Sequence, residues 1–305
     1  RSSITRNFFA FTRANETAAD QAALNYLDVL GISAQGMIKV FDLLRQQERQ
    51  RFGAPDPYLR THPLTNERID FVRNHVTQSR IAPGTYPKEL TEWHARMVAK
   101  LVAFLQPPEK TLRTYSASDN SVAGRMARAI AFFRQAQMAQ SIPLMDALVK
   151  EYPHDPYLHD LRGQIMFESA RMDDALHSYR EAARLLPNHP LILVDLAKTE
   201  IAANDPSLLN SAIEHLEKSV SIDARNGFAW RQMARAYGKQ NNQPMATLAL
   251  AEESLLMGDV KEAIRQSSNA MNSLKEGSPA RQRAMDVNRR ALKMKQEQDD
   301  AASPF

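Results

Sequence analysis

The sequence predicts an all-α fold whose C-terminal half is a superhelix of paired helices. A 34-residue unit at 156–189 has small and aromatic residues at the spacing expected where two antiparallel helices cross. Units of the same kind precede and follow it in the same phase. The 305 residues include only 10 glycines and few alternating β-branched runs, which favours helices over strands.

The clearest unit depends on Gly163, Ala175, Tyr179 and Pro187. We expect Gly163 and Ala175 at the helix crossing, because a larger side chain there would push the two helices apart. Tyr179 fills the gap above them, and Pro187 ends the second helix. This spacing is that of the tetratricopeptide repeat. One helix pair cannot bury its own apolar face, so neighbouring pairs must stack on it.

Further units are predicted on both sides of this one. The downstream neighbour carries about three extra residues in its 204–210 turn, where an insertion costs least. Gly258, Ala263 and Ala270 indicate a half-repeat that reuses the preceding helix. A basic and polar helix then caps the stack. The units are 122–155, 190–226 and 227–260, and the capping helix is 279–298.

Residues 5–30 are predicted to form one helix that carries two acidic side chains on one face. Glu16 and Asp20 stand at positions i and i+4, and the alanines beside them allow another helix to approach closely. Two carboxylates facing a close neighbour require positive charge. Arg6 or Arg13 could supply it, so a purely structural role for the pair stays open at this point.

Short motifs follow one another along the first 68 residues. They are Glu16-Thr17-Ala18-Ala19-Asp20, Tyr26-Leu27 before Gly31, Met37, and Thr61-His62-Pro63 followed by Arg68. With the repeats behind them, they resemble the BepA-like zinc metalloproteases. These are bacterial HExxH peptidases with a helical catalytic domain and a C-terminal tetratricopeptide domain, exported to the periplasm. The resemblance covers most of the chain.

The resemblance implies a zinc site and a role for three residues. Glu16 corresponds to the third protein ligand of the zinc, after the two histidines of HExxH. Asp20 corresponds to the carboxylate that orients a zinc-bound histidine. His62 matches a histidine that can approach the metal and hold the enzyme latent.

The sequence departs from this family in one important respect. HExxH does not occur in residues 1–305. Without it, two histidine ligands and the general base are missing, so we expect the chain alone to bind little zinc and to be inactive. The simplest explanation is that the chain is the C-terminal portion of a protease, cut just downstream of HExxH. A degenerate relative is the alternative.

A helix at 87–106 is expected to turn an apolar stripe inward, and His94 on this stripe is expected to be a packing residue rather than a metal ligand. No metal role is expected for the histidines in the repeats.

The expected domain organisation has four segments. They are the helical C-terminal part of a metalloprotease domain at 1–110, a linker at 111–121, the repeat domain at 122–298 and a tail at 299–305.

Composition narrows the range of partners. The chain is 43% hydrophobic and 24% charged, with a net charge of +4 and basic and acidic residues interspersed, so a nucleic-acid partner is not expected. There are no cysteines, which excludes disulfides and thiolate zinc sites. No apolar run approaches the roughly 18 residues of a membrane-spanning helix.

Two functions remain in competition. The first is a fragment of a periplasmic zinc endopeptidase whose repeats dock on the outer-membrane assembly machinery or on a substrate. The second is a non-catalytic scaffold or chaperone-like module that binds a protein or peptide in the repeat groove. In either case Arg162, Met166 and Gln232 are the expected groove-lining residues. The upstream coding sequence discriminates between them, since the first function requires it to encode HExxH.

Overall fold

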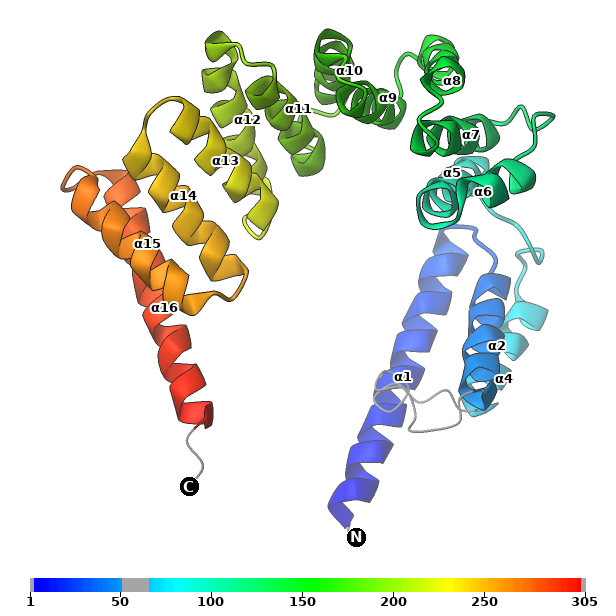
Figure 1. Ribbon diagram of the computed structural model, residues 1–305. Coiled ribbons are helices and arrows are strands. Elements are labelled where there is room, and N and C mark those ends of the chain that lie inside the picture. The colour runs from blue at the N-terminus through cyan, green and yellow to red at the C-terminus, as the bar shows by residue number, and fades with distance from the viewer. Residues whose placement is uncertain (1–2, 51–65, 303–305) are drawn as a thin grey trace. The chain divides into compact units, whose positions relative to one another are not determined.

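The computed structural model describes residues 3–50 and 66–302, and within these ranges every regular element is a helix (Figure 1). The prediction of an all-α class is confirmed. None of the described helices is both long enough and apolar enough to cross a membrane. The chain divides into two compact units, Arg1–Val98 and Ala99–Phe305, and the division falls within one helix.

The described residues of the first unit form three helices and the start of a fourth. Here α4 packs on both α1 and α2. Gly31 ends α1 with a φ of +65°, a left-handed conformation that glycine adopts without steric cost, as predicted. A small core of Leu24, Phe41, Ile69 and Val72 holds the three together. The helices are α1 (Ser3–Val29), α2 (Gln35–Gln50), α4 (Asn66–Gln78) and the first part of α5 (Lys88–Leu105).

The face that α5 buries differs from the prediction. Ala99 and Ala103 are fully buried in the core of the second unit, whereas the opposite face of the helix is exposed. The small alanine side chains let the backbone of α5 approach its neighbours closely. We infer that this close packing decides which face is buried, although the opposite face carries larger apolar side chains. The exposed residues, all expected inside, are Leu90, His94, Met97, Leu101 and Leu105.

The second unit consists of stacked antiparallel helix pairs. Each helix packs mainly on the next one in the chain, as expected for tetratricopeptide-like repeats. The helices are α6 (Pro108–Thr114), α7 (Val122–Arg134), α8 (Met138–Glu151), α9 (Pro156–Glu168), α10 (Met172–Leu185), α11 (Pro190–Ala202), α12 (Leu209–Ile222), α13 (Gly227–Lys239), α14 (Gln243–Leu256), α15 (Val260–Ser273) and α16 (Pro279–Ala302), with a 3₁₀ turn η1 (Pro206–Leu208).

A left-handed residue between paired helices marks the phase of the repeats. Ala136, Ala170 and Asn204 have φ values of 57°, 58° and 55° and follow one another at 34-residue intervals. Asn241 comes 37 residues later, and η1 occupies the intervening insertion. Gly258 follows after only 17 residues, which is half a period. The backbone thus reproduces the predicted insertion and the predicted half-repeat.

Gly163 occupies the helix crossing for the predicted reason. A Cβ atom at this position would lie 2.9 Å from three ring carbons of Tyr179. Tyr179 is 1% exposed and Ala175 is fully buried, so neither the ring nor the helix behind it has free space. The close approach of α9 and α10 therefore depends on the missing side chain.

The C-terminal end of the stack reuses α14. This helix packs as closely on α15 as on α13, and α16 packs on both α14 and α15. Ala284, Val287 and Ala291 form the buried stripe of α16. The capping helix is longer than expected, because α16 continues to Ala302.

The segment expected as a linker is only partly irregular. Gln106 and Pro107 separate α5 from α6, which begins at Pro108 and continues to Thr114. Thr111 is fully buried, and its hydroxyl donates to the carbonyl of Val102. The first part of the 111–121 segment therefore belongs to the packed second unit, and the division between units falls earlier than residue 110.

Candidate functional site

Glu16 and Asp20 lie together on α1 and meet an arginine from α4. The Arg68 guanidinium donates to both Asp20 oxygens, with Nε 2.6 Å from Oδ2 and Nη2 2.9 Å from Oδ1. Its Nη1 is 2.8 Å from Oε2 of Glu16. One planar guanidinium thus binds two carboxylates that are separated by one helical turn.

This cluster is largely shielded from solvent. The side chains of Glu16, Asp20 and Arg68 are 14%, 6% and 12% exposed. The guanidinium carbon of Arg68 also lies 5.3 Å from the ring centroid of Phe41 on α2, within the range of a cation–π contact. The cluster therefore connects α1, α2 and α4, and it fixes the plane of the Asp20 carboxylate.

Sequence reasoning found the two acids but not their partner. The cations that the sequence suggests, Arg6 and Arg13, have side chains outside the described residues, and His62 also lies outside them. Arg68 is 48 positions from Asp20, so no helical spacing connects them. The available signal was the position of Arg68 shortly after the Thr61-His62-Pro63 motif.

The described residues do not form a complete metal site. Among them there is no group of three or more His, Cys, Asp or Glu side chains placed to hold a metal ion. In this structure Glu16 binds Arg68. The carboxylates fit a metal centre only as a contribution to a ligand set completed by other residues, and they perform no catalytic step by themselves.

Two of the three predicted groove residues lie inside the repeats. Met166 is fully buried between α9 and α10, in the cluster that contains Tyr179. Arg162 is 13% exposed and connects α8 to α10, with Nε 2.7 Å from Asp146 Oδ1 and Nη1 2.5 Å from Ser178 Oγ. Both stabilise the stack, so their assignment to a partner surface is corrected.

Gln232 lies on a different face of its helix from the one predicted. It is 2% exposed and accepts a hydrogen bond from Arg235. The neighbouring residues Trp230, Met233 and Tyr237 follow i, i+3, i+7 spacing along α13 and line a pocket instead. Gln232 itself is buried away from this pocket.

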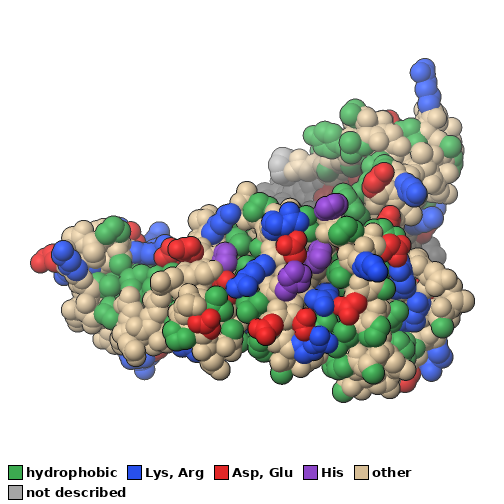
Figure 2. All heavy atoms as spheres, turned by 90° about the horizontal axis from the view of Figure 1, so that it is seen from above, with side chains coloured by type: hydrophobic (Ala, Val, Ile, Leu, Met, Phe, Trp, Pro, Cys, Tyr) green, Lys and Arg blue, Asp and Glu red, His purple; other side chains and the backbone are tan. Residues whose placement is uncertain are grey.

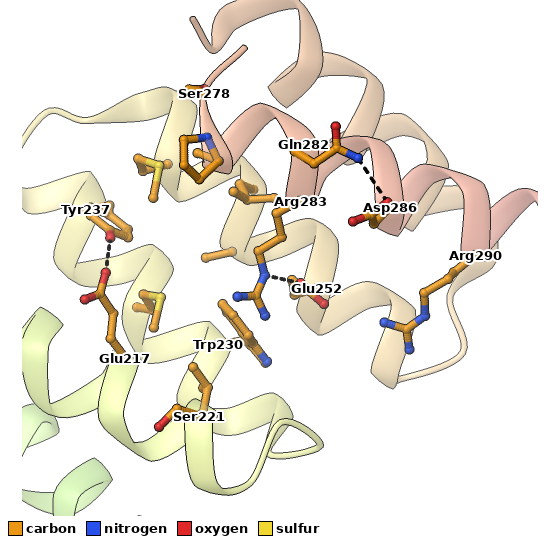
Figure 3. Close-up of a pocket in the computed structure, with 17 residues that line it drawn as sticks. Glu217, Ser221, Trp230, Tyr237, Glu252, Ser278, Gln282, Arg283, Asp286 and Arg290 are labelled. Atoms are coloured by element: carbon orange, nitrogen blue, oxygen red, sulfur yellow. Dashed lines mark hydrogen bonds and ion pairs between the residues drawn. The ribbon is translucent and has the colours of Figure 1, made fainter. Parts of the chain in front are cut away.

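The pocket has a volume of about 950 Å³ and opens between α12, α13, α14 and α16 (Figure 3). Its floor is apolar, and Arg283 lies over the Trp230 ring at 4.4 Å from the centroid. Arg283 Nε is also 2.6 Å from Glu252 Oε1. On the opposite side, the Tyr237 hydroxyl donates to Glu217 at 3.2 Å. The pocket therefore combines an apolar floor with a charged rim.

A largely buried carboxyl group in the repeats has a raised pKa. Burial raises the pKa of Asp160 on α9 to about 6, with Lys100 lowering it and Asp195 raising it further. Lys100 Nζ is 4.0 Å from Asp160 Oδ2, which is too distant for a hydrogen bond. Asp160 therefore gains little from the nearest cation.

Charged residues of both signs share the molecular surface. Figure 2 shows Lys and Arg interspersed with Asp and Glu, and several His side chains near one another on the face in view. His159 is a packing residue, 8% exposed, with Nε2 3.0 Å from the Pro153 carbonyl. His215 pairs with the buried Glu200 at 3.0 Å. These two histidines thus have structural partners.

The acidic cluster lies in a segment that is similar to a known peptidase family. Residues 2–76 match the model described as Peptidase family M48. The N-terminal unit is peptidase-like. This match covers the whole Glu16–Asp20–Arg68 cluster. With the repeats behind it, the chain is a metallopeptidase-like protein with a tetratricopeptide-like helical fold.

Two curated relatives are similar to this protein over most of the chain. The beta-barrel assembly-enhancing protease of Yersinia pestis is 22% identical over 276 residues, and that of Escherichia coli (strain K12) is 24% identical over 290 residues. Each match covers 90% of this chain and 56% of the relative. The crystal structure of yeast Tom70 is 16% identical, with a TM-score of 0.43, covering 95% of this chain and 60% of that one.

These matches confirm the family resemblance that the sequence motifs indicated. The chain spans about half the length of the curated relatives it matches, 56% in each case. The matched metallopeptidase segment and the helical repeats occur in the predicted order.

Proposed function

We propose that this chain is part of a zinc-dependent endopeptidase and supplies carboxylate side chains to its metal centre. The observation that carries the proposal is the Arg68-bound pair of carboxylates within the segment that matches the M48 family. Glu16 would provide an anionic zinc ligand. Asp20 would accept a hydrogen bond from a zinc-bound histidine, and His62 would act as a latch over the metal.

The Arg68 contacts are compatible with these roles. A carboxylate has about four lone-pair positions, so a hydrogen bond from arginine does not by itself prevent metal ligation. Arg68 binds Asp20 through two parallel hydrogen bonds, which fixes the plane of that carboxylate. Arg68 would thus be a positioning residue that holds both acids toward the missing ligands.

The repeats would supply the partner. The relatives are named for beta-barrel assembly, and we propose that the second unit docks on the outer-membrane assembly machinery or its substrates in the periplasm. A non-catalytic scaffold is the competing function, and the pocket between α12 and α16 favours it as the activity of the chain alone.

Zinc content tests the metal proposal. The protein is produced with its upstream coding sequence, dialysed, and assayed for bound zinc by mass spectrometry. Glu16→Gln should lose zinc and peptidase activity together, because the anionic ligand is removed. Asp20→Asn should weaken zinc binding by about 10–100-fold, since it acts on a ligand rather than on the metal. His62→Ala should raise activity if the latch is present.

A second carboxylate on α1 provides the matched control. Asp28 pairs with His75 at 3.1 Å near the end of the helix. Asp28→Asn should leave zinc content unchanged. Full zinc occupancy and activity in Glu16→Gln would contradict the metal-site assignment, and an upstream sequence without HExxH would favour the scaffold function.

A further inference from the structure

The acidic side chains that line the pocket on the repeats already have partners within the protein. Glu217 accepts from Tyr237, and Glu252 pairs with Arg283. Asp286 lies 3.4 Å from Arg289. Each of these three acidic side chains at the pocket therefore already has a donor from the protein.

Arg290 is the exception among the charged residues of the pocket. It lies two turns beyond Arg283 on α16, on the same face, and Figure 3 shows its guanidinium reaching toward the pocket. Within residues 66–302 no acidic side chain forms an ion pair with it, unlike Arg283 and Arg289. A carboxylate entering the pocket would find a free cation, whereas an ammonium group would have to compete for carboxylates already in use.

The apolar floor of the pocket can adapt to apolar ligand side chains of different shapes. Trp230 and Met233 are each 3% exposed, and the partly buried Met245 lies beside them. Methionine side chains adapt their shape to different apolar groups. The pocket volume of about 950 Å³ accommodates more than one side chain of a ligand.

We infer that this pocket binds an acidic peptide segment that places an apolar side chain beside Trp230 and Met233 and a carboxylate against Arg290. This inference rests on the proposed partner-binding role of the repeats and assigns it to α12–α16. It moves the recognition surface from the predicted residues Arg162, Met166 and Gln232 to the apolar face of α13 and the cationic face of α16.

Four pools of fluorescein-labelled peptides of equal length test this assignment on the whole chain. Each pool contains either the apolar residues Leu and Phe or the small residues Ser and Gly. Each pool also contains either the acidic residues Asp and Glu or the basic residue Lys. Binding is measured by fluorescence anisotropy. The pool with both apolar and acidic residues should bind most tightly. Arg290→Glu should weaken its binding by about 10–100-fold, because a hydrogen bond between charged groups is replaced by repulsion.

Lys295 provides the matched control. It is exposed on α16, and Lys295→Glu makes the same change of charge without altering the pocket lining. Lys295→Glu should bind the acidic apolar pool as the unchanged chain does. Circular dichroism confirms that both variants keep their helical content.

Trp230 offers a second, local measurement. The chain has only two tryptophans, so Trp93→Phe leaves Trp230 as the sole indole fluorophore. Titration with the acidic apolar pool should change Trp230 emission in this background. An unchanged emission with full anisotropy would place the peptide elsewhere and overturn the inference.

The remaining outcomes also decide the question. Preference for the lysine pools, equal loss in Arg290→Glu and Lys295→Glu, or no binding by any pool would each overturn it. Binding that is insensitive to Arg290→Glu would overturn the site but leave partner binding by the repeats intact. The zinc measurements on Glu16 variants are independent of all these results.

Discussion

Gly163→Ala tests the helix crossing on which the repeat register depends. The new Cβ would lie 2.9 Å from three ring carbons of Tyr179, about 0.5 Å closer than the 3.4 Å at which ordinary contact begins. The ring is 1% exposed and cannot swing into solvent. Relief therefore requires a shift of α9 against α10, and overpacking of this kind costs about 1–3 kcal/mol. The larger Gly163→Leu should cost more.

Gly238→Ala is the matched control because its Cβ would meet no heavy atom within 4 Å. It should be neutral or stabilise the protein by up to about 1 kcal/mol, since alanine favours helices more than glycine does. Comparing the two variants separates the steric clash from the propensity gain that both share. For a unit of this size, 1 kcal/mol corresponds to a melting-temperature shift of about 2–4 °C, measured by circular dichroism.

A double-mutant cycle with Tyr179→Leu locates the clash. With the ring removed, Gly163→Ala should no longer destabilise, which gives a coupling energy of about 1–3 kcal/mol. If Gly163→Ala melts as high as Gly238→Ala in the unchanged background, the crossing has been misassigned. The repeat register built on Gly163 would then be wrong.

Two further predictions concern stability. Asp160 has a folded-state pKa of about 6 against an ordinary value of 3.8, so the folded state binds more protons between these values and stability should fall as pH rises from about 4 to 6. Asp160→Asn should remove that pH dependence and stabilise the protein at neutral pH, by on the order of 3 kcal/mol at most, in urea titrations; an unchanged pH profile would contradict the buried carboxylate. Ala170 has a φ of 58°, which favours glycine, so Ala170→Gly should be neutral or stabilise by up to about 1 kcal/mol. Ala147→Gly, exposed in the middle of α8, should destabilise by about 0.5–1 kcal/mol, and equal melting temperatures would contradict the left-handed turn.

The repeats could be predicted because their determinants are local. Gly163 and Tyr179 lie within one 34-residue period, and the same spacing recurs along the chain. The helix face of α5 could not be predicted, because both its alanine face and its leucine face fit a helical period. Only tertiary packing decides that Ala99 and Ala103 are buried and Leu101 is exposed.

The acidic cluster shows a second limit of sequence reasoning. Helical spacing brings Glu16 and Asp20 to one face, but it cannot identify a cation from a different helix. The presence of a nearby positive charge followed from the cost of burying two acids. Its identity, Arg68, required the packing of α4 against α1.

The composition of that cluster argues for a role beyond stability. Replacing a buried ion pair or triad by apolar side chains of similar volume often leaves stability unchanged or improves it, so holding three helices together does not require charge. The cluster nevertheless contains two carboxylates on one helix turn, with a guanidinium that fixes the plane of one and contacts the other. Fixed carboxylates are what a metal ligand and the acceptor for a ligating histidine require. This geometry supports the proposed metal centre more directly than it supports a structural role alone.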